Sequence, residues 1–395
     1  MDIICFSHLR WNFVHQRPQH LLSRFTDYRT VFYVEEFTRT SEPDGYTIHS
    51  PYENLYIVVP HLQDLKDDNN ENSRLEIIIS SLCEAYQISS PLLWYYTPMA
   101  LNFTSHLQPR LVVYDCMDEL SNFKYAPPSI KKMEARLFEL ADIVFTGGNT
   151  LYEAKKHLHH NIYSFPSSID KDHFALARTA LKEFPDQAAI PSPRLGFYGV
   201  IDERFDIELI REAAELRPEW HFVLIGPVVK IDPETLPRHS NIHYLGPKEY
   251  DVLPAYLAGW DIALIPFAIN ESTRYISPTK TPEYLAGGKP VISTPITDVI
   301  NPYGNEKLVH IVENGEQLIE KATIELHSRT KSVWLKRVDQ FLSNLSWDDT
   351  WRAMNDLITR ELMKIESINP KTKSYVRFRD SRGRTGWVSS GREAV

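Results

Sequence analysis

Short apolar runs alternate with amphipathic segments along the first half of the chain. The runs have the length and composition of buried strands and lie at residues 3–6, 31–34, 55–59, 92–96, 111–114 and 143–146. Segments with apolar residues at helical spacing fall between several of them, at 17–25, 74–86 and 129–141. Buried strands that alternate with helices are typical of a doubly wound parallel sheet.

The second half of the chain repeats this plan. Its predicted strands are 195–198, 221–225, 242–244, 262–265, 291–293 and 309–312, with helices at 207–215, 252–258 and 315–328. A polar stretch that ends in Ile190-Pro191-Ser192-Pro193 separates the two halves. We therefore expect an α/β protein with two Rossmann-like domains, at 1–170 and 194–345, joined by a linker at 171–193.

Length and composition agree with two domains. The chain has 395 residues, of which 43% are hydrophobic, and this is too long for one ordinary domain. A net charge of -9 argues against nucleic acid as a partner. Cys5, Cys83 and Cys116 are widely spaced and read as buried thiols, and no metal-type spacing of Cys and His is found. The chain starts without a basic signal region and has no apolar stretch of about 20 residues, so a cytoplasmic location is expected.

The most informative chemistry lies between the apolar runs 262–265 and 291–293. Ser-Pro and Thr-Pro open this segment and Gly-Gly closes it, which predicts a short helix between two strands. Its start carries the side chains of Ser277, Pro278, Thr279, Lys280 and Glu283. Unpaired helix N–H groups and a lysine suit a diphosphate, and a carboxylate one turn later suits ribose hydroxyls. The alternative is a capped crossover helix with an incidental lysine.

The run from Glu283 to Val291 resembles glycosyltransferases of group 1, and residues 277–286 resemble a bacterial branch that builds surface polysaccharides. The resemblance implies the GT-B architecture, in which two Rossmann-like domains face each other across a cleft. It also implies that Glu283 holds the ribose of a nucleotide sugar, while Lys280 and the preceding loop hold its diphosphate. Tyr275 is a departure, because that class carries a second glutamate there; the nearest upstream acid is Glu271, and retaining and inverting mechanisms both stay open.

Further loops of the second domain are expected to contribute to the donor site. Gly199 follows a strand, and the resemblance assigns to Arg204 a contact with the diphosphate, although Asp202 and Glu203 are alternative partners for it. The loop that contains Lys248 is expected near the nucleobase. Ordinary strand-ending turns are the alternative for these loops.

In the first domain, Asp115 and Asp118 follow the predicted strand 111–114, at the sheet edge where open α/β folds place ligands. A carboxylate there can accept the proton of an acceptor hydroxyl, with Asp118 as first choice and Asp115 as second. The alternative for Asp115 is a turn cap. Arg17 and His20 lie in a run that resembles the same polysaccharide branch and are expected on the acceptor side, or else are exposed helix residues.

The resemblance to GT-B enzymes also implies that the last helix crosses back to the first domain. Ser346 is a good N-cap for a helix at 346–366, and Trp347 and Trp351 give that helix an apolar face; packing on its own domain is the alternative. The basic tail at 367–395 is expected either to be disordered or to rest on an anionic membrane surface.

Together these features predict a hexosyltransferase that needs no obligatory metal or cofactor. Its donor is a nucleotide sugar, with a UDP-sugar favoured, and its acceptor is a hydroxyl of a glycan or lipid-linked acceptor. The expected location is the cytoplasm, with contact at the inner face of the membrane as a further option. The alternatives are a nucleotide-sugar epimerase and a non-catalytic sugar-nucleotide-binding subunit.

Overall fold

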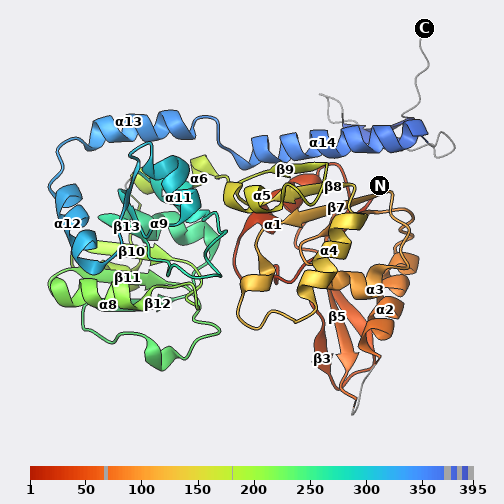
Figure 1. Ribbon diagram of the computed structural model, residues 1–395, viewed down its shortest axis with the longest axis horizontal. Coiled ribbons are helices and arrows are strands. Elements are labelled where there is room, and N and C mark those ends of the chain that lie inside the picture. The colour runs from red at the N-terminus through yellow and green to blue at the C-terminus, as the bar shows by residue number, and fades with distance from the viewer. Residues whose placement is uncertain (66–69, 180, 369–374, 380–384, 390–395) are drawn as a thin grey trace, which may run out of the picture.

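The computed structural model describes residues 1–65, 70–179, 181–368, 375–379 and 385–389 and divides them into two domains that lie side by side (Figure 1). The first contains a sheet with the order β3-β5-β2-β1-β6-β7-β8-β9, in which β4 pairs antiparallel with β5 and the other strand pairs are parallel. Its strands are β1 (Ile3–Phe6), β2 (Val31–Val34), β3 (Thr38–Thr40), β4 (Gly45–His49), β5 (Leu55–Gln63), β6 (Leu92–Tyr95), β7 (Leu111–Cys116), β8 (Ile143–Thr146) and β9 (Ile162–Ser164). Its helices are α1 (Arg17–Phe25), α2 (Glu71–Ala85), α3 (Leu101–Thr104), α4 (Ile130–Leu140) and α5 (Asn149–Lys155).

The second domain contains a parallel sheet with the order β12-β11-β10-β13-β14-β15. Its strands are β10 (Arg194–Tyr198), β11 (His221–Ile225), β12 (Ile242–Gly246), β13 (Ile262–Ile265), β14 (Val291–Ser293) and β15 (Val309–Ile311). The helices of this half are α8 (Ile207–Leu216), α9 (Leu253–Ala258), α10 (Lys280–Ala286), α11 (Thr297–Val299), α12 (Gly315–Leu326) and α13 (Lys331–Leu342).

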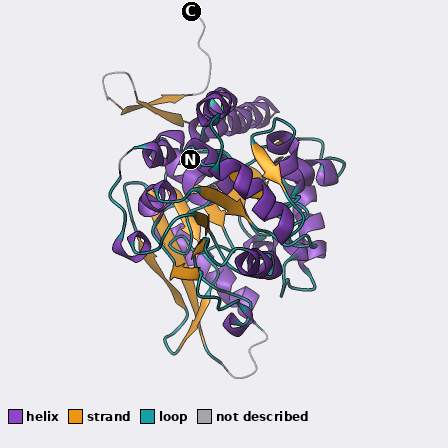
Figure 2. Cartoon of the chain, turned by 90° about the vertical axis from the view of Figure 1, so that its left-hand side faces the viewer, coloured by secondary structure: helices purple, strands orange, loops and turns teal. Residues whose placement is uncertain are grey.

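Each sheet lies within its own apolar core, which is why its central strands are apolar on both faces. In β1, β2, β6 and β8 of the first domain, and in β13 and β14 of the second, every residue is buried. Helices therefore cover both faces, as a parallel sheet requires. Figure 2 shows this arrangement from the side of the second domain, with strands surrounded by helices. The prediction of two α/β domains with parallel sheets is confirmed.

The segment between the domains packs on the second domain. It contains α6 (Lys171–Ala175) and α7 (Pro185–Ala188), and Phe174 and Ala177 are buried in the same apolar cluster as β10 and β13. The chain therefore leaves the first domain after β9 and joins the core of the second before β10 begins.

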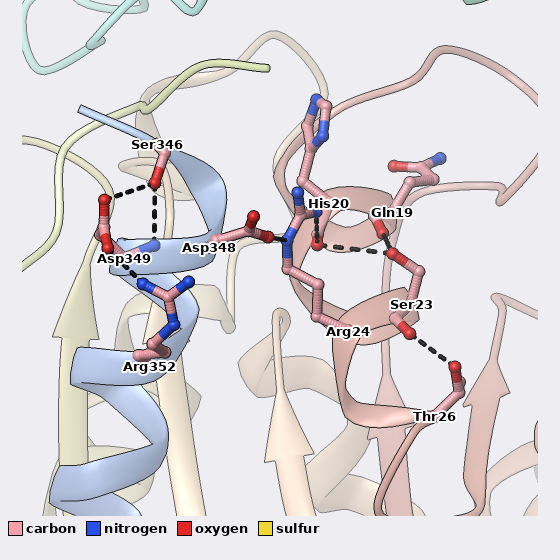
Figure 3. A network of polar contacts seen from close by, with 9 residues as sticks. All are labelled: Gln19, His20, Ser23, Arg24, Thr26, Ser346, Asp348, Asp349 and Arg352. Atoms are coloured by element: carbon pink, nitrogen blue, oxygen red, sulfur yellow. Dashed lines mark hydrogen bonds and ion pairs between the residues drawn. The ribbon is translucent and has the colours of Figure 1, made fainter. Parts of the chain in front are cut away.

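Helix α14 (Trp347–Ile368) crosses back to the first domain, along which it runs in Figure 1. Trp347, Met354 and Ile358 are buried in the cluster that also holds β1 and β2. Figure 3 shows the start of this contact, where Arg24 of α1 binds Asp348 at 2.5 Å. Ser346 accepts a hydrogen bond from the Asp349 N–H at 3.0 Å, as the predicted N-cap requires.

Other elements differ from the pattern-based expectation. Strands β3 and β4, which each pair with β5 at the edge of the first sheet, were not predicted, because none of their residues is buried and they carry no apolar run. In the basic tail, β16 (Tyr375–Arg379) and β17 (Thr385–Ser389) pair antiparallel with each other (Figure 2). The rest of the predicted tail beyond residue 368 lies outside the described residues. Across the part of the chain that is described, no helix is both long and apolar enough to span a bilayer.

Candidate functional site

Lys280 lies across the carboxyl end of β10, at the first residue of α10. Gly199 follows β10 with φ of 144°, and a Cβ atom there would lie 2.3 Å from Cε of Lys280. Only glycine leaves room for the lysine to cross at this point. The ammonium group lies 5.8 Å from the ring centroid of Phe197 and 5.9 Å from that of Phe267. Gly199 and Lys280, which were each predicted for the donor site, therefore lie close together, with two aromatic side chains around the cation.

The ammonium of Lys280 lies in a poorly solvated position. Burial lowers its pKa to about 8, with a further lowering by Arg204 and opposing effects of Glu283 and Asp202. The ammonium group of Lys280 makes no hydrogen bond or ion pair with any residue in the described ranges. A partly desolvated cation without a direct partner is well suited to an anionic ligand.

Arg204 lies in the same region and is held by a neighbour in the sequence. Its guanidinium makes a bidentate contact with Asp202, with Nε to Oδ1 at 2.9 Å and Nη2 to Oδ2 at 2.7 Å. Its other neighbour is Phe123 of the first domain, whose ring centroid lies 5.4 Å away. The alternative that the sequence left open, an ion pair with Asp202, is thus present. It also fixes the position of Arg204 close to Lys280.

Glu283 is buried one turn into α10, at 5% exposure. Its carboxylate accepts a hydrogen bond of 2.7 Å from the hydroxyl of Tyr198 at the end of β10. Burial raises the pKa of Glu283 to about 7, against the opposing effects of Tyr198 and Lys280. Tyr198 therefore engages one carboxylate oxygen of Glu283, and the ribose contact that the sequence predicts stays a prediction for the other.

Asp118 faces this group from the first domain. It follows β7, is half-buried, and has a pKa raised to about 6, mainly by burial and also by Asp202, against the lowering effects of Arg204 and Arg17. The two domains thus place a carboxyl group with a raised pKa near Arg204 of the opposite domain. A general base that works near neutral pH needs a pKa in this range.

Asp115 and Arg17 pair with each other rather than lining an open surface. Nε of Arg17 lies 3.0 Å from each carboxylate oxygen of Asp115, and Nη1 donates to the carbonyl of Phe165 at 2.7 Å. Asp115 is 0% exposed and Arg17 is 3% exposed. The alternative of an exposed Arg17 is therefore wrong. The pair joins β7 to α1 and supports the strand that carries Asp118.

His20 is also buried, at 4% exposure, so the alternative of an exposed helix residue is wrong for it as well. Its ring stacks on Trp347 at 4.6 Å and meets the edges of His15 and Tyr250. Burial lowers its pKa well below the ordinary value. In this position His20 connects α1 with α14 and with the loop after β12.

The remaining predicted donor residues lie around α10 and on the loop after β12. Ser277 accepts at its carbonyl a 2.6 Å hydrogen bond from Ser167, so the loop that contains Pro278 is tied to the end of the first domain. Thr279 is the N-cap of α10 but makes no side-chain capping bond. Lys248 binds Asp186 at 2.7 Å near the surface. Lys248 is thus engaged by the segment between the domains.

Sequence reasoning missed two tyrosines of the site. Tyr198 binds Glu283, and the hydroxyl of Tyr250 is buried without a hydrogen-bond partner among the described residues. The ring of Tyr250 is stacked between His15 at 4.1 Å and His173 at 4.6 Å. Tyr198 ends β10 and Tyr250 lies in the loop after β12, and these places were a usable signal, since ligands gather at that edge of a parallel sheet. Among the described residues, no cluster of three or more His, Cys, Asp or Glu could hold a metal ion.

Comparisons with known proteins agree with this arrangement. Residues 192–328, which cover most of the second domain, match the family described as Glycosyl transferases group 1. A curated relative is TuaH of Bacillus subtilis (strain 168), whose name assigns it to teichuronic acid biosynthesis as a glycosyltransferase. The two are 28% identical over 223 residues, which is 51% of this chain and 55% of the relative. The match thus spans about half the length of each protein.

Solved structures resemble nearly the whole chain. Sucrose-phosphate synthase from Thermosynechococcus elongatus superposes with a TM-score of 0.68 at 15% identity, covering 92% of this chain and 99% of that chain. HepE from Anabaena, solved with UDP and glucose, gives 0.62 at 13% identity, covering 91% and 99%. An E. coli structure titled trehalose-6-phosphate, bound with UDP-2-fluoro glucose, gives 0.65 at 10% identity, covering 92% and 99%. At these identities the likeness establishes the fold, which is GT-B, as the sequence predicted.

Proposed function

We propose that this chain, a GT-B protein whose second domain matches the group 1 glycosyltransferases, transfers a hexose from a UDP-sugar to a hydroxyl of a glycan or lipid-linked acceptor. The observation that carries the proposal is Lys280, a half-buried cation near Arg204 at the carboxyl end of the second sheet, with its pKa lowered by desolvation. Glu283 lies one turn further along α10, in position for ribose hydroxyls. In a nucleoside diphosphate, the diphosphate would face Lys280 and Arg204, and the adjoining ribose would face Glu283.

In this proposal the cations stabilise the charge that develops on the departing diphosphate. Fixed positive groups in a poorly solvated site are effective for this purpose, because they need little reorganisation during the reaction. Asp202 holds Arg204 in place, and the aromatic rings beside Lys280 exclude water. Asp118 approaches from the first domain and accepts the proton of the acceptor hydroxyl.

The comparisons support the uridine base and the carbohydrate product. HepE was solved with UDP and glucose, and the E. coli neighbour with UDP-2-fluoro glucose. The name of TuaH places that relative in the synthesis of a polysaccharide. We therefore favour UDP-glucose or a related UDP-hexose as donor and a growing surface glycan as acceptor.

The proposal is tested by thermal unfolding with a panel of nucleotides. UDP and UDP-glucose should raise the melting temperature, since a ligand at 100 times its Kd stabilises a fold by about 2.7 kcal/mol. GDP, ADP and 2′-deoxy-UDP should stabilise less, the last because it lacks a hydroxyl for Glu283. A stronger effect of GDP or ADP would reassign the base, and no effect of any nucleotide would refute the proposal.

Activity then separates the enzyme from its alternatives. With UDP-glucose and a glycan extract as acceptor, release of UDP should depend on the extract. An epimerase would convert the donor sugar with no acceptor present. A non-catalytic subunit would bind UDP-glucose and release no UDP under any condition.

A further inference from the structure

A cavity of about 550 Å³ lies where the two domains meet, beside the loop that follows β7. Its first wall comes from that loop and from α4, and its second from residues 271 and 275 of the other domain. Hydrogen bonds join the walls, from Asn122 Nδ2 to the carbonyl of Glu271 at 3.1 Å and from Ser272 Oγ to the carbonyl of Asn122 at 2.8 Å. Its size falls within the roughly 300–1,000 Å³ of small-molecule sites.

The base of the cavity is an ordered polar network. Lys155 is 5% exposed and binds Glu119 and Glu134, each at 2.7 Å. Glu134 also accepts a 2.8 Å hydrogen bond from the hydroxyl of Tyr114. Partial burial raises the pKa of Glu119, but the hydrogen bonds from Lys155 and Ser121 outweigh it, so the net shift is downward and the carboxylate is ionised at neutral pH. Fixed carboxylates of this kind can accept hydrogen bonds from ligand hydroxyls.

The walls combine apolar surface with further negative charge. Phe138 and Tyr275 line the cavity, and Tyr275 also packs against the core of the first domain. Glu139 and Glu271 add two exposed carboxylates. Among the described lining residues, Lys131 is the one that carries a positive charge. Even when Lys155 at the base is counted, the glutamates of the cavity outnumber its lysines.

The cavity adjoins the proposed reaction site through two neighbouring residues. The side chain of Glu119 binds Lys155 at the cavity base, whereas Asp118 is influenced by Arg204 and Asp202 of the second domain. In the loop after β7, Asp118 thus faces the donor side, and the next residue, Glu119, faces the cavity. A sugar in the cavity would lie beside the residue proposed as the base.

We propose that this cavity binds the acceptor sugar and selects neutral or amino sugars against sugars that carry a carboxylate or phosphate. The inference rests on the proposed glycosyltransferase function. Hydroxyl groups satisfy the carboxylates, and the two aromatic side chains cover the apolar face of a sugar ring. A uronic acid or sugar phosphate would instead place like charges next to each other, which is unfavourable in a partly desolvated site.

The test compares three sugar probes of the same aglycone, of which one carries a carboxylate. Binding of p-nitrophenyl β-glucoside, p-nitrophenyl β-glucosaminide and p-nitrophenyl β-glucuronide is measured by saturation-transfer NMR and calorimetry with UDP at saturation. The glucoside and the glucosaminide should bind about tenfold more tightly than the glucuronide. Ionic strength of about 1 M, where the Debye length is about 3 Å, should reduce that difference.

Charge reversal at exposed positions tests whether the glutamates that line the cavity cause the discrimination against the glucuronide. The double variant Glu139→Lys/Glu271→Lys should bind the glucuronide at least as well as the glucoside, because it reverses two charges without touching the buried network. Glu53→Lys, an exposed change outside the lining, should keep the discrimination of the wild type. Equal binding of all three probes to the wild type, binding of none, or unchanged discrimination in the double variant would overturn the inference. Absence of UDP binding would instead refute the proposed function.

Discussion

At the residue scale, Lys280 gives the clearest prediction. Lys280→Ala should weaken UDP binding by roughly 10- to 150-fold and leave uridine binding nearly unchanged, since a charge-assisted contact contributes about 1.5–3 kcal/mol. Lys289→Ala is the matched control: burial lowers the pKa of Lys289 to about 8 as well, but its ammonium donates to the carbonyls of Ala258 and Trp260. Equal losses for UDP and uridine, measured by calorimetry, would remove Lys280 from the diphosphate site.

The same lysine predicts a pH dependence of binding. The diphosphate favours protonated Lys280, and the pKa of the free protein is lowered to about 8. The contribution of Lys280 to UDP affinity should therefore be full below pH 8 and decline as the pH rises through that value. Lys280→Arg should abolish the decline, because a guanidinium stays charged in this range.

Asp118 carries the prediction for the chemical step. Asp118→Asn should leave UDP binding intact and lower turnover by about 10²-fold or more. Because the pKa of Asp118 is raised to about 6, wild-type turnover should fall as the pH drops through that value, and the variant should lack this limb. A variant that keeps both its turnover and its acid limb would assign the base to another group. Asp115→Asn would not replace this test, since that change breaks the buried pair with Arg17.

At the scale of the elements, α5 is capped by a residue of the opposite domain. Asp298 accepts hydrogen bonds of 3.0 Å from the N–H groups of Asn149 and Thr150. A Cβ atom at Gly148 would lie 2.5 Å from Asp298 and 3.0 Å from Ser277, so the domains approach closely beside the donor loop.

This cap should stabilise the closed arrangement of the domains as well as the helix. Asp298→Ala should cost about 0.5–2 kcal/mol of unfolding free energy, the usual value of an N-cap, and should also weaken UDP binding. Asn314→Ala removes a comparable cap, that of α12 within the second domain, and should cost stability alone. The comparison uses thermal unfolding and calorimetry. Loss of UDP affinity in both variants, or in neither, would speak against a link between the cap and the site.

At the scale of the whole molecule, the last helix stabilises the domain that comes first in the chain. Met354 is fully buried against the first domain, whereas Met363 on the same helix is 61% exposed. Met354→Ala should cost about 2–5 kcal/mol and Met363→Ala almost nothing. Hydrogen exchange should locate the loss in β1 and β2 of the first domain. A loss confined to the second domain would contradict this account of α14.

The amino-acid sequence by itself determined most of the elements and the centre of the site. Buried parallel strands must be apolar on both faces, so β1, β2, β11 and β13 have the predicted bounds. The short helix that carries Lys280 and Glu283 was predicted because proline and glycine at its ends act locally. Helix α14 was predicted from its N-cap and from the spacing of its tryptophans, and its return to the first domain from the resemblance to GT-B enzymes.

Only the tertiary structure decided which polar groups meet. Arg17 and Asp115 are 98 positions apart in the sequence and pair because α1 packs against β7. Asp118 faces Arg204 because two domains come together, and the cap of α5 and the cavity beside α4 arise from the same contact. The hydrophobic pattern of a segment predicts which of its residues are buried, whereas the partner of a charged side chain depends on long-range packing. For that reason the sequence predicted the donor residues one by one, and the folded chain determined how they are arranged.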